Sequence, residues 1–375
     1  MKKIRICHFT NHITGRSDGV YTHLMMLFKY LDKSTYEQFL VFQGDEKIEN
    51  EVQALGVKVI VIPTIDNKFP INCLIQFLRF VKSYKIDIIQ AHYLKPYIIG
   101  AIANIVLRKK MIFNYHGLFI NNLYNNYFEK LAYRFFHSLS VLLGSVNLAL
   151  AESLANKENL LRETKSFPEI RVYYNGFDPD MGDTIDINIV DHLTKLKEIY
   201  FIVGIIARIE IQKRIDVSLN IAKTVVSKFP KTFFIYFGDG PDLYNMKKKI
   251  QTLGLGKNVE FMDYIPGAKA YIKFFDILLF TSDWEGLPLS LWEAMANGVP
   301  IASTDVGGIK EIVEGEKCGI IFPKSSINEG AAVIEEFILN KELKNNLGKN
   351  GFEAIRNKYT LSAFIKTMET IYLDI

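Results

Sequence analysis

The chain has 375 residues, enough for two domains of ordinary size. Hydrophobic residues make up 49% of it and charged residues 23%, a balance that is typical of folded globular proteins and excludes a disordered scaffold. The net charge of +4 is modest. No nucleic-acid partner is expected. The three cysteines lie far apart and predict neither a disulfide framework nor a zinc site, which favours a reducing cytoplasm.

The start of the chain, MKKIRICHFTNH, predicts a first strand and not a signal peptide, because its apolar run is short and no small-residue cleavage site follows. The most apolar stretches, Tyr97–Leu107 and Leu139–Leu150, fall short of the ~20 residues that cross a bilayer. Residues 1–180 hold 22 Lys and Arg against 16 Asp and Glu, a net +6. This basic half is expected to meet an anionic acceptor or an anionic membrane surface, and an idle solvated surface is the equal alternative.

Short apolar, β-branched runs alternate with amphipathic helical stretches, a pattern that predicts parallel strands joined by crossover helices. The expected strands of a first series are Ile4–Phe9, Phe39–Phe42, Val57–Ile62, Ile86–Ala91, Met111–Asn114, Val146–Leu150 and Arg171–Tyr174. Those of a second series are Tyr200–Ile206, Thr232–Phe237, Val259–Met262, Ile277–Thr281, Pro300–Ser303 and Gly319–Phe322. The fold class is therefore α/β, with two Rossmann-like, doubly wound parallel sheets.

A hinge between the two series is predicted at Asn175–Asp186, NGFDPDMGDTID, which clusters Asn, Gly, Asp and Pro without apolar periodicity. We expect one domain over 1–180 and another over 181–360, facing a central cleft. The last helical stretch, 361–375, could pack back on the first domain. Open α/β sheets bind ligands outside the carboxyl ends of their strands, so the loops there are expected to carry the chemistry.

The most informative motif is Thr281–Pro300, TSDWEGLPLSLWEAMANGVP, in which a strand ends and a helix begins near Pro288. Glu285 then lies in the loop and Glu293 inside the helix. Free backbone amides over 286–290 and the positive end of the helix dipole favour a phosphate between the two carboxylates. One carboxylate could accept sugar hydroxyls and the other ribose hydroxyls. From these residues alone, an ordinary capped helix with solvated glutamates stays open.

The run EGLPLSLWEAMANGVP resembles the E-x7-E motif of retaining glycosyltransferases with the GT-B fold, family GT4. The resemblance extends from the first strand to about Pro323. It implies that Glu285 contacts the donor sugar near the reaction centre and that Glu293 holds the ribose. The neighbouring residues assigned to the nucleotide-sugar are Gly286, Leu287, Pro288 and Leu289.

Two cations, Arg208 and Lys213, lie in the loop after the first strand of the second series, within VGIIARIEIQKR. Arginine can neutralise a diphosphate with a bidentate fork and lysine as a point charge, whereas the residues alone favour plain surface cations. The stretch is similar to the family's G-R-L-x-x-x-K-G segment, whose Arg and Lys bind the donor diphosphate. It departs from this segment at Ala207 and Arg214, where glycines are usual.

Glycines mark two further loops. Gly238 and Gly240 in FGDGP follow a strand and match the family's G-x-G-P loop beside the nucleoside, although a plain turn explains them equally well. Gly19, in GRSDGVYTH, would let backbone amides at a helix start reach the diphosphate. The family usually has a Gly-Gly pair there, and a simple strand-to-helix turn is the alternative.

His116, in FNYHGLF, follows a strand and could donate a hydrogen bond to a sugar hydroxyl or steer the acceptor, whereas the residue alone favours a core or capping histidine. Its place resembles the family's Y/T-x-H-G site, which faces the donor sugar. His92 matches a mostly structural position and is left out of the catalytic set. Asp178 and Asp180 spell a D-x-D metal motif, but YNGFD matches the family's P-N-G-V-D hinge element, so no metal site is expected.

The resemblance implies transfer of a sugar from a nucleotide-sugar, on family grounds a UDP-sugar, to a hydroxyl of a saccharide or lipid-linked saccharide in bacterial surface polysaccharide assembly. Domain 1–180 becomes the acceptor side and 181–360 the nucleotide-sugar side. Cationic side chains and helix amides would stabilise the leaving diphosphate, so no metal or other cofactor is expected. The alternatives are a nucleotide-sugar epimerase of similar fold and a catalytically silent sugar-nucleotide-binding subunit.

An aromatic and basic stretch, 118–143, suggests peripheral contact with the cytoplasmic face of an anionic membrane. The aromatics expected at the interface beside Lys130 and Arg134 are Tyr124, Tyr127, Phe128, Tyr133, Phe135 and Phe136. Core packing of a crossover helix has equal weight, because an aromatic stripe is usually packing.

Overall fold

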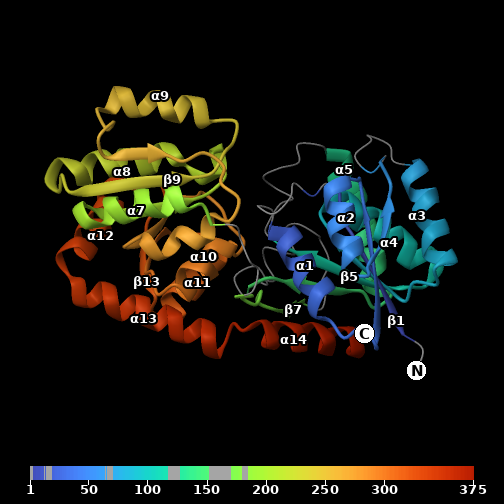
Figure 1. Cartoon of the computed structure of the whole chain (residues 1–375). Coiled ribbons are helices and arrows are strands. Elements are labelled where there is room, and N and C mark those ends of the chain that lie inside the picture. The colour runs from blue at the N-terminus through green and yellow to red at the C-terminus, as the bar shows by residue number, and fades with distance from the viewer. Residues whose placement is uncertain are drawn as a thin grey trace. The chain divides into compact units, whose positions relative to one another are not determined.

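The computed structural model describes residues 3–11, 13, 19–63, 65, 71–116, 127–151, 170–179 and 185–375. Two compact units divide the chain. Unit 1 comprises Met1–Gly176 and Leu361–Ile375, and unit 2 comprises Phe177–Thr360. Each unit is built on one parallel sheet with helices on its faces (Figure 1).

The sheet of unit 1 is parallel throughout its described pairings. Its strands are β1 (Ile4–Phe9), β2 (Tyr36–Phe42), β3 (Lys58–Val61), β4 (Ile88–His92), β5 (Lys110–Tyr115), β6 (Val146–Ala149) and β7 (Ile170–Val172). The spatial order is β3-β2-β1-β4-β5-β6-β7. The order therefore reverses between β1 and β4, which is where open α/β sheets bind ligands.

Helices cover both faces of this sheet. They are α1 (Gly19–Tyr30), α2 (Glu46–Ala54), α3 (Ile71–Ser83), α4 (Leu94–Leu107), α5 (Tyr127–Leu142) and α14 (Leu361–Asp374). One core cluster joins α3, α4 and α5 to the sheet, and a second joins α1 and α2 to the opposite face of β2. The final helix α14 contacts α1, and Tyr372 Oη donates a hydrogen bond to Gln90 Oε1 of β4 at 2.5 Å.

Unit 2 repeats this design with a second parallel sheet. Its strands are β8 (Phe201–Ile206), β9 (Thr232–Phe237), β10 (Val259–Phe261), β11 (Ile277–Phe280), β12 (Ile301–Thr304) and β13 (Gly319–Phe322). The order is β10-β9-β8-β11-β12-β13, so the reversal falls between β8 and β11.

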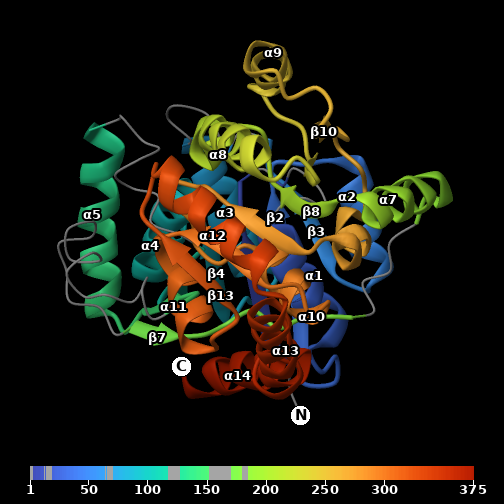
Figure 2. The ribbon, with the colours of Figure 1, turned by 90° about the vertical axis from the view of Figure 1, so that its left-hand side faces the viewer.

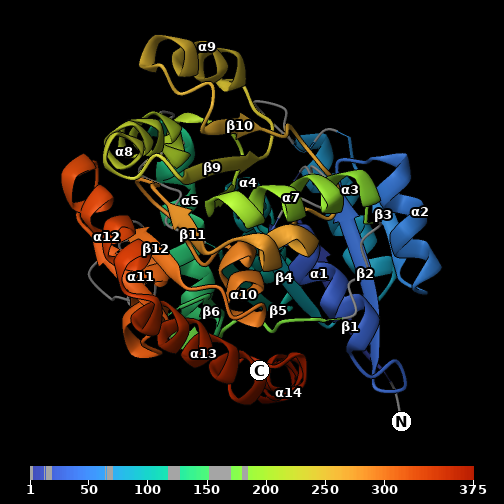
Figure 3. The same cartoon turned by 60° about the vertical axis from the view of Figure 1, so that its left-hand side comes forward.

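The helical segments of unit 2 also lie on two faces. They are α7 (Ile187–Ile199), η1 (Ile211–Lys213), α8 (Ile215–Lys228), α9 (Leu243–Leu253), η2 (Ala268–Phe274), α10 (Leu289–Ala296), α11 (Gly307–Gly315), α12 (Ile327–Leu339) and α13 (Lys341–Asn357). Helices α8 and α12 pack side by side over the main core cluster (Figure 2). Both α7 and α10 contact η2, which packs on β8 from the other face (Figure 3).

Every strand expected from the sequence overlaps an observed strand, and the two doubly wound parallel sheets are confirmed. The reason is that strands covered on both faces carry nearly continuous apolar runs, which are easily seen in a sequence. All six residues of β9, TFFIYF, are buried.

Candidate active site

Glu285 lies in the loop between β11 and α10 of unit 2. Pro288 caps α10 with φ −67°, and the helix begins at Leu289, as the proline predicted. Glu285 is 9% exposed, and its Oε1 accepts hydrogen bonds from Lys213 Nζ and Ser282 Oγ, each at 2.6 Å. Two donors on one carboxylate oxygen, one of them charged, hold this side chain in one orientation.

Lys213 reaches Glu285 because of the strand order. β8 and β11 are neighbouring parallel strands, so the loops beyond their carboxyl ends meet. Thr281 Oγ1 donates to the carbonyl of Lys213 at 2.9 Å, and the two loops are thereby joined. The Lys213 side chain is 18% exposed, so the ion pair with Glu285 is largely shielded from water.

Arg208, on the same loop, is not part of this pair. Its side chain is 64% exposed, and its Nε lies 3.4 Å from Glu210 Oε2. An exposed ion pair of this kind contributes only about 0–1 kcal/mol. The guanidinium is therefore weakly held and accessible, which a diphosphate ligand requires, and that role stays a prediction.

The second glutamate of the motif, Glu293, is the fifth residue of α10 and is half-buried. The loop before it is braced by the next loop along the sheet, because Gly308 N donates to Gly286 O at 3.0 Å and Thr304 Oγ1 donates to Ser282 O at 2.7 Å. Leu287 is 5% exposed, so it is a core side chain that could contact a ligand only through its backbone.

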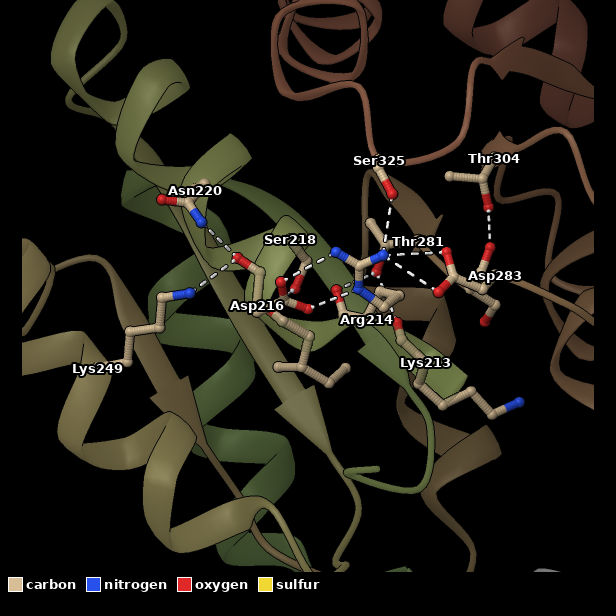
Figure 4. A network of polar contacts seen from close by, with 12 residues as sticks. Lys213, Arg214, Asp216, Ser218, Asn220, Lys249, Thr281, Asp283, Thr304 and Ser325 are labelled. Atoms are coloured by element: carbon tan, nitrogen blue, oxygen red, sulfur yellow. Dashed lines mark hydrogen bonds and ion pairs between the residues drawn. The ribbon is translucent and has the colours of Figure 1, made fainter. Parts of the chain in front are cut away.

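Arg214 stands where the family usually has glycine, and its backbone explains why glycine is usual. Its φ of 49° and ψ of 47° are left-handed, a conformation that costs a residue with a Cβ about 1–2 kcal/mol. The guanidinium binds Asp216 at 3.0 Å, Asp283 at 3.1 Å and Ser325 at 2.9 Å, whereas the side chain of Lys213 extends away from this network (Figure 4). These contacts offset the strain, and no motif in the sequence predicts them.

Gly238 and Gly240 are explained by close packing inside unit 2. A Cβ on Gly238 would lie 1.9 Å from the carbonyl oxygen of Ala207, and one on Gly240 would lie 2.3 Å from that of Ile209. Both glycines thus let the turn after β9 pack against the loop that carries Arg208. Their contact with a nucleoside stays a prediction.

In unit 1, His116 directly follows β5 and belongs to a largely buried cluster that the sequence motifs do not predict. We call His8, His23, His92, His116 and Asn114 the histidine cluster. His92 Nδ1 lies 2.8 Å from His116 Nε2, and Asn114 Nδ2 lies 3.2 Å from the same nitrogen. His92, whose position in the family is mostly structural, therefore contacts the candidate site residue directly. The sequence contains one sign of this cluster: His8, His92, Asn114 and His116 lie at or just beyond the ends of strands, whereas His23 comes from α1.

Burial keeps the cluster uncharged. It lowers the pKa of His8 to about 3 and that of His23 to about 4. Burial, followed by repulsion from neighbouring histidines, holds the pKa of His92 and of His116 well below the ordinary value. All four imidazoles are thus neutral at pH 7.

Gly19 is the first residue of α1, and a Cβ added there would meet nothing within 4 Å, so packing does not require the glycine.

Asp178 is 5% exposed, while Asp180 lies outside the described residues. Within the described part of the chain, no group of three or more His, Cys, Asp or Glu side chains is placed to hold a metal ion.

Helix α5 divides the aromatic stretch between core and surface. Tyr133 is 0% exposed and forms a hydrogen bond with Tyr115, so its assignment to a membrane interface is wrong. Phe136 is partly buried and packs against the same core cluster. Tyr124 lies outside the described residues. The exposed apolar residues of the helix are Tyr127, Phe128, Leu131, Phe135 and Leu142. No described helix is long and apolar enough to span a membrane.

Comparison with known proteins identifies the family. The model described as Glycosyltransferase Family 4 matches residues 17–181, and the model described as Glycosyl transferases group 1 matches residues 190–354. N-acetyl-alpha-D-glucosaminyl L-malate synthase of Bacillus anthracis is 26% identical, over 77% of this chain and 75% of its own. UDP-Gal:alpha-D-GlcNAc-diphosphoundecaprenol alpha-1,3-galactosyltransferase of Escherichia coli is 23% identical, over 99% and 97%.

Solved structures agree on the fold. Anabaena HepE in complex with UDP-glucose superposes with a TM-score of 0.79 at 18% identity, covering 98% of this chain and 100% of that one. The two doubly wound sheets are thus those of the GT-B fold. The chain belongs to the GT4-type glycosyltransferases of the GT-B fold, and it is a glycosyltransferase enzyme.

Proposed function

We propose that this glycosyltransferase takes its sugar from a UDP-sugar, retains the anomeric configuration and uses no metal ion. We further propose a saccharide or lipid-linked saccharide acceptor in bacterial surface polysaccharide assembly. The observation that carries the proposal is the shielded pair of Lys213 and Glu285 at the carboxyl ends of β8 and β11. The UDP-glucose bound in Anabaena HepE and the diphosphoundecaprenol-linked sugar in the name of the Escherichia coli relative support the donor and the acceptor class.

In the proposed reaction the bond between donor C1 and the phosphate oxygen breaks, and an acceptor hydroxyl forms the new bond to C1 on the same face. The acceptor proton passes to the leaving phosphate. Lys213, Arg208 and the backbone amides at the start of α10 stabilise the charge that develops on the diphosphate. Glu285 accepts hydrogen bonds from the sugar, and Glu293 accepts them from the ribose.

A donor panel tests the substrate class. Each nucleotide-sugar is incubated with the enzyme, and mass analysis identifies the nucleotide released. Release of UDP from one UDP-sugar is the expected result, and turnover confined to another base would contradict the proposed donor. The epimerase alternative would instead convert a nucleotide-sugar without releasing the nucleotide.

The role of Glu285 is tested by Glu285→Gln, which keeps the shape but removes the charge. Turnover is expected to fall by about 10²-fold or more, with UDP affinity nearly unchanged, because the residue serves the sugar and not the nucleotide. Glu314→Gln is the control, since it removes an exposed carboxylate from the same unit. Unfolding of both variants is measured, because Lys213 loses its partner. Wild-type turnover in folded Glu285→Gln rejects the assignment.

We also propose peripheral contact of α5 with an anionic membrane on the cytoplasmic side. Phe128, Leu131 and Phe135 are 78%, 53% and 59% exposed, and their spacing puts them on one stripe of the helix. Lys130 and Arg134 lie to one side of this stripe, and residues 1–180 carry the net charge of +6. Apolar burial and attraction to anionic headgroups would then act together.

Vesicle sedimentation tests this contact. Phosphatidylglycerol vesicles are expected to bind the enzyme at low salt and to release much of it when salt is raised, while phosphatidylcholine vesicles bind it poorly. The double variant Phe128→Ser/Phe135→Ser should lose binding. Tyr244→Ser, which changes a 77% exposed aromatic residue of unit 2, should keep it. The absence of wild-type binding at low salt would reject membrane contact.

A further inference from the structure

The histidine cluster occupies a nearly dry site at the carboxyl ends of β1, β4 and β5. His8, His23, His92 and Asn114 are 0% exposed. The rings of His92 and His116 are stacked with their centroids 5.1 Å apart, and the ring of His23 meets that of His116 edge-on at 5.1 Å. Because little water reaches these rings, the protons of His23, His92 and His116 are placed by the donors and acceptors that face each ring nitrogen.

The assignment of protons starts at His23. Its Nδ1 lies 2.9 Å from Asn175 Oδ1, and a carboxamide oxygen only accepts, so Nδ1 carries the proton. Neutral His23 then has a bare Nε2. This nitrogen lies 3.3 Å from Asn114 Nδ2, which donates to it.

The hydrogen bonds of Asn114 also determine which ring nitrogen of His116 carries the proton. Its Nδ2 carries two N–H groups, and the second one faces His116 Nε2 at 3.2 Å. This nitrogen accepts, so the single proton of neutral His116 lies on Nδ1. His92 Nδ1, which is 2.8 Å from the same acceptor, is then a second donor to it.

The opposite arrangement would turn buried acceptors that have no partner into buried donors that have none. If the side-chain amides of Asn175 and Asn114 were both turned over, His92 would accept a hydrogen bond at Nδ1. Its proton would then lie on Nε2, a buried atom with no partner in the described part of the chain. The amino group of Asn114 would take the place of its Oδ1, which likewise has no partner among the described residues. Asn114 Nδ2 also lies 3.4 Å from His92 Nδ1, but an arrangement in which that nitrogen accepts would likewise put the His92 proton on Nε2, which has no partner among the described residues. Buried donors without acceptors are disfavoured, so the first arrangement is favoured.

We propose that Asn114, His23 and His92 are positioning residues that hold His116 as the neutral tautomer with its proton on Nδ1. His116 then offers the sugar a hydrogen-bond donor and does not act as a general base through Nε2, because two donors already occupy that nitrogen. The contact with the donor sugar rests on the proposed function. The tautomer does not.

The tautomer can be measured by NMR on the full chain with nitrogen-15 in the imidazole rings, since bare and protonated ring nitrogens resonate at different shifts. The His116 signals are assigned by their loss in His116→Gln. At pH 7.5 we expect a protonated Nδ1 and a bare Nε2. A proton on Nε2, or an equal mixture of tautomers, overturns the proposal.

We call the chain of hydrogen bonds from Asn175 through His23 and Asn114 to His116 the relay. Asn114→Asp tests this relay, because a carboxylate of nearly the same shape as the amide can only accept hydrogen bonds. The His116 proton should move to Nε2, and turnover should fall by about 10²-fold, as expected when one oriented donor is lost. Asn147→Asp is the matched control: it places the same charge at a 0% exposed residue of unit 1 that contacts His137 and not the histidine cluster. Its His116 tautomer should not change.

An unchanged His116 tautomer in folded Asn114→Asp contradicts the relay. If that variant does not fold, the wild-type spectrum still decides the proposal. Failure of the proposed function gives a different result. In that case wild-type His116 shows the expected tautomer while His116→Gln keeps full turnover, so the relay stands and the sugar contact is wrong.

Discussion

Acidification from pH 7.5 to 5.0 is expected to destabilise unit 1 much more than unit 2. Three buried histidines of unit 1 have a folded-state pKa far below the ordinary 6.5, because burial disfavours the charged ring: about 3 for His8, and about 4 for His23 and His137. Such a group takes up a proton on unfolding. Its contribution to stability is therefore complete above pH 6.5 and is lost as the pH falls from 6.5 toward the folded-state pKa.

The size of the effect follows from the pH window. At pH 5.0 each of the three histidines is about 1.5 pH units below its unfolded pKa and still neutral when folded, which costs about 2 kcal/mol per residue. Together they would remove about 6 kcal/mol, which is comparable with the 5–15 kcal/mol that stabilises a typical domain. His92 and His116 act in the same direction. Among the described residues of unit 2, the only histidine is His192, whose side chain is 41% exposed.

Urea unfolding at pH 7.5 and at pH 5.0, followed by hydrogen exchange and mass spectrometry, measures the stability of each unit separately. Peptides from β4 and β5 should lose protection at much lower urea at pH 5.0, and peptides from β9 and β11 should shift little. His137→Gln is expected to reduce the pH dependence of unit 1 by about 2 kcal/mol, whereas the control His192→Gln should leave it unchanged. If unit 1 kept its pH 7.5 stability at pH 5.0, the neutral burial of these rings would be refuted.

Three further predictions concern unit 2. Arg214→Gly and Arg214→Ala lose the same side-chain contacts, but only alanine keeps the left-handed strain, so the alanine variant should be less stable by about 1 kcal/mol in urea unfolding; equal stabilities would contradict this account. Glu293→Ala should weaken UDP binding measured by calorimetry, because a ribose contact is lost, and an unchanged Kd would remove that role. Excess chelator should leave initial rates intact, and loss of activity that magnesium or manganese restores would redirect attention to Asp178 and Asp180.

The sequence was sufficient to predict the elements that bury apolar residues on both faces. The apolar pattern predicts strands at Ile4–Phe9 and Thr232–Phe237, the same residues that β1 and β9 occupy in the structure. The start of α10 after Pro288 was also predicted, because proline has a fixed φ that suits the position before a helix. These features depend on local composition, which a single sequence contains.

The polar contacts of the site could not be predicted in the same way. Asn114, His23 and Asn175 come from different elements and show no common spacing, and they meet only because the sheet order brings the ends of their strands and α1 together. The prediction that Tyr133 of α5 lies at a membrane interface was wrong for a related reason. Tyr133 and Phe135 are both plausible core or surface residues until the direction of the sheet fixes which side of α5 is covered.

Strand order also explains how two distant residues form the centre of the candidate site. Lys213 and Glu285 are far apart in the chain, and each motif alone is compatible with a solvated side chain. Once β8 and β11 are neighbours at the point where the order reverses, their loops share one edge of the sheet, and the 2.6 Å ion pair follows.

Arg214 shows how the loop after β8 keeps its path without the glycine that the family usually has. The left-handed backbone at this position would be met most simply by glycine, yet arginine is accommodated because Asp216 and Asp283 bind its guanidinium. Asp283 is two residues before Glu285, so the contact that offsets the strain also ties the loop after β8 to the loop that carries the candidate catalytic carboxylate. The missing glycine is therefore no sign of a lost site here. An arginine at this position needs its acidic partners to keep the loop path, and replacing Asp283 should disturb Lys213 and Glu285 more than replacing the arginine by glycine does.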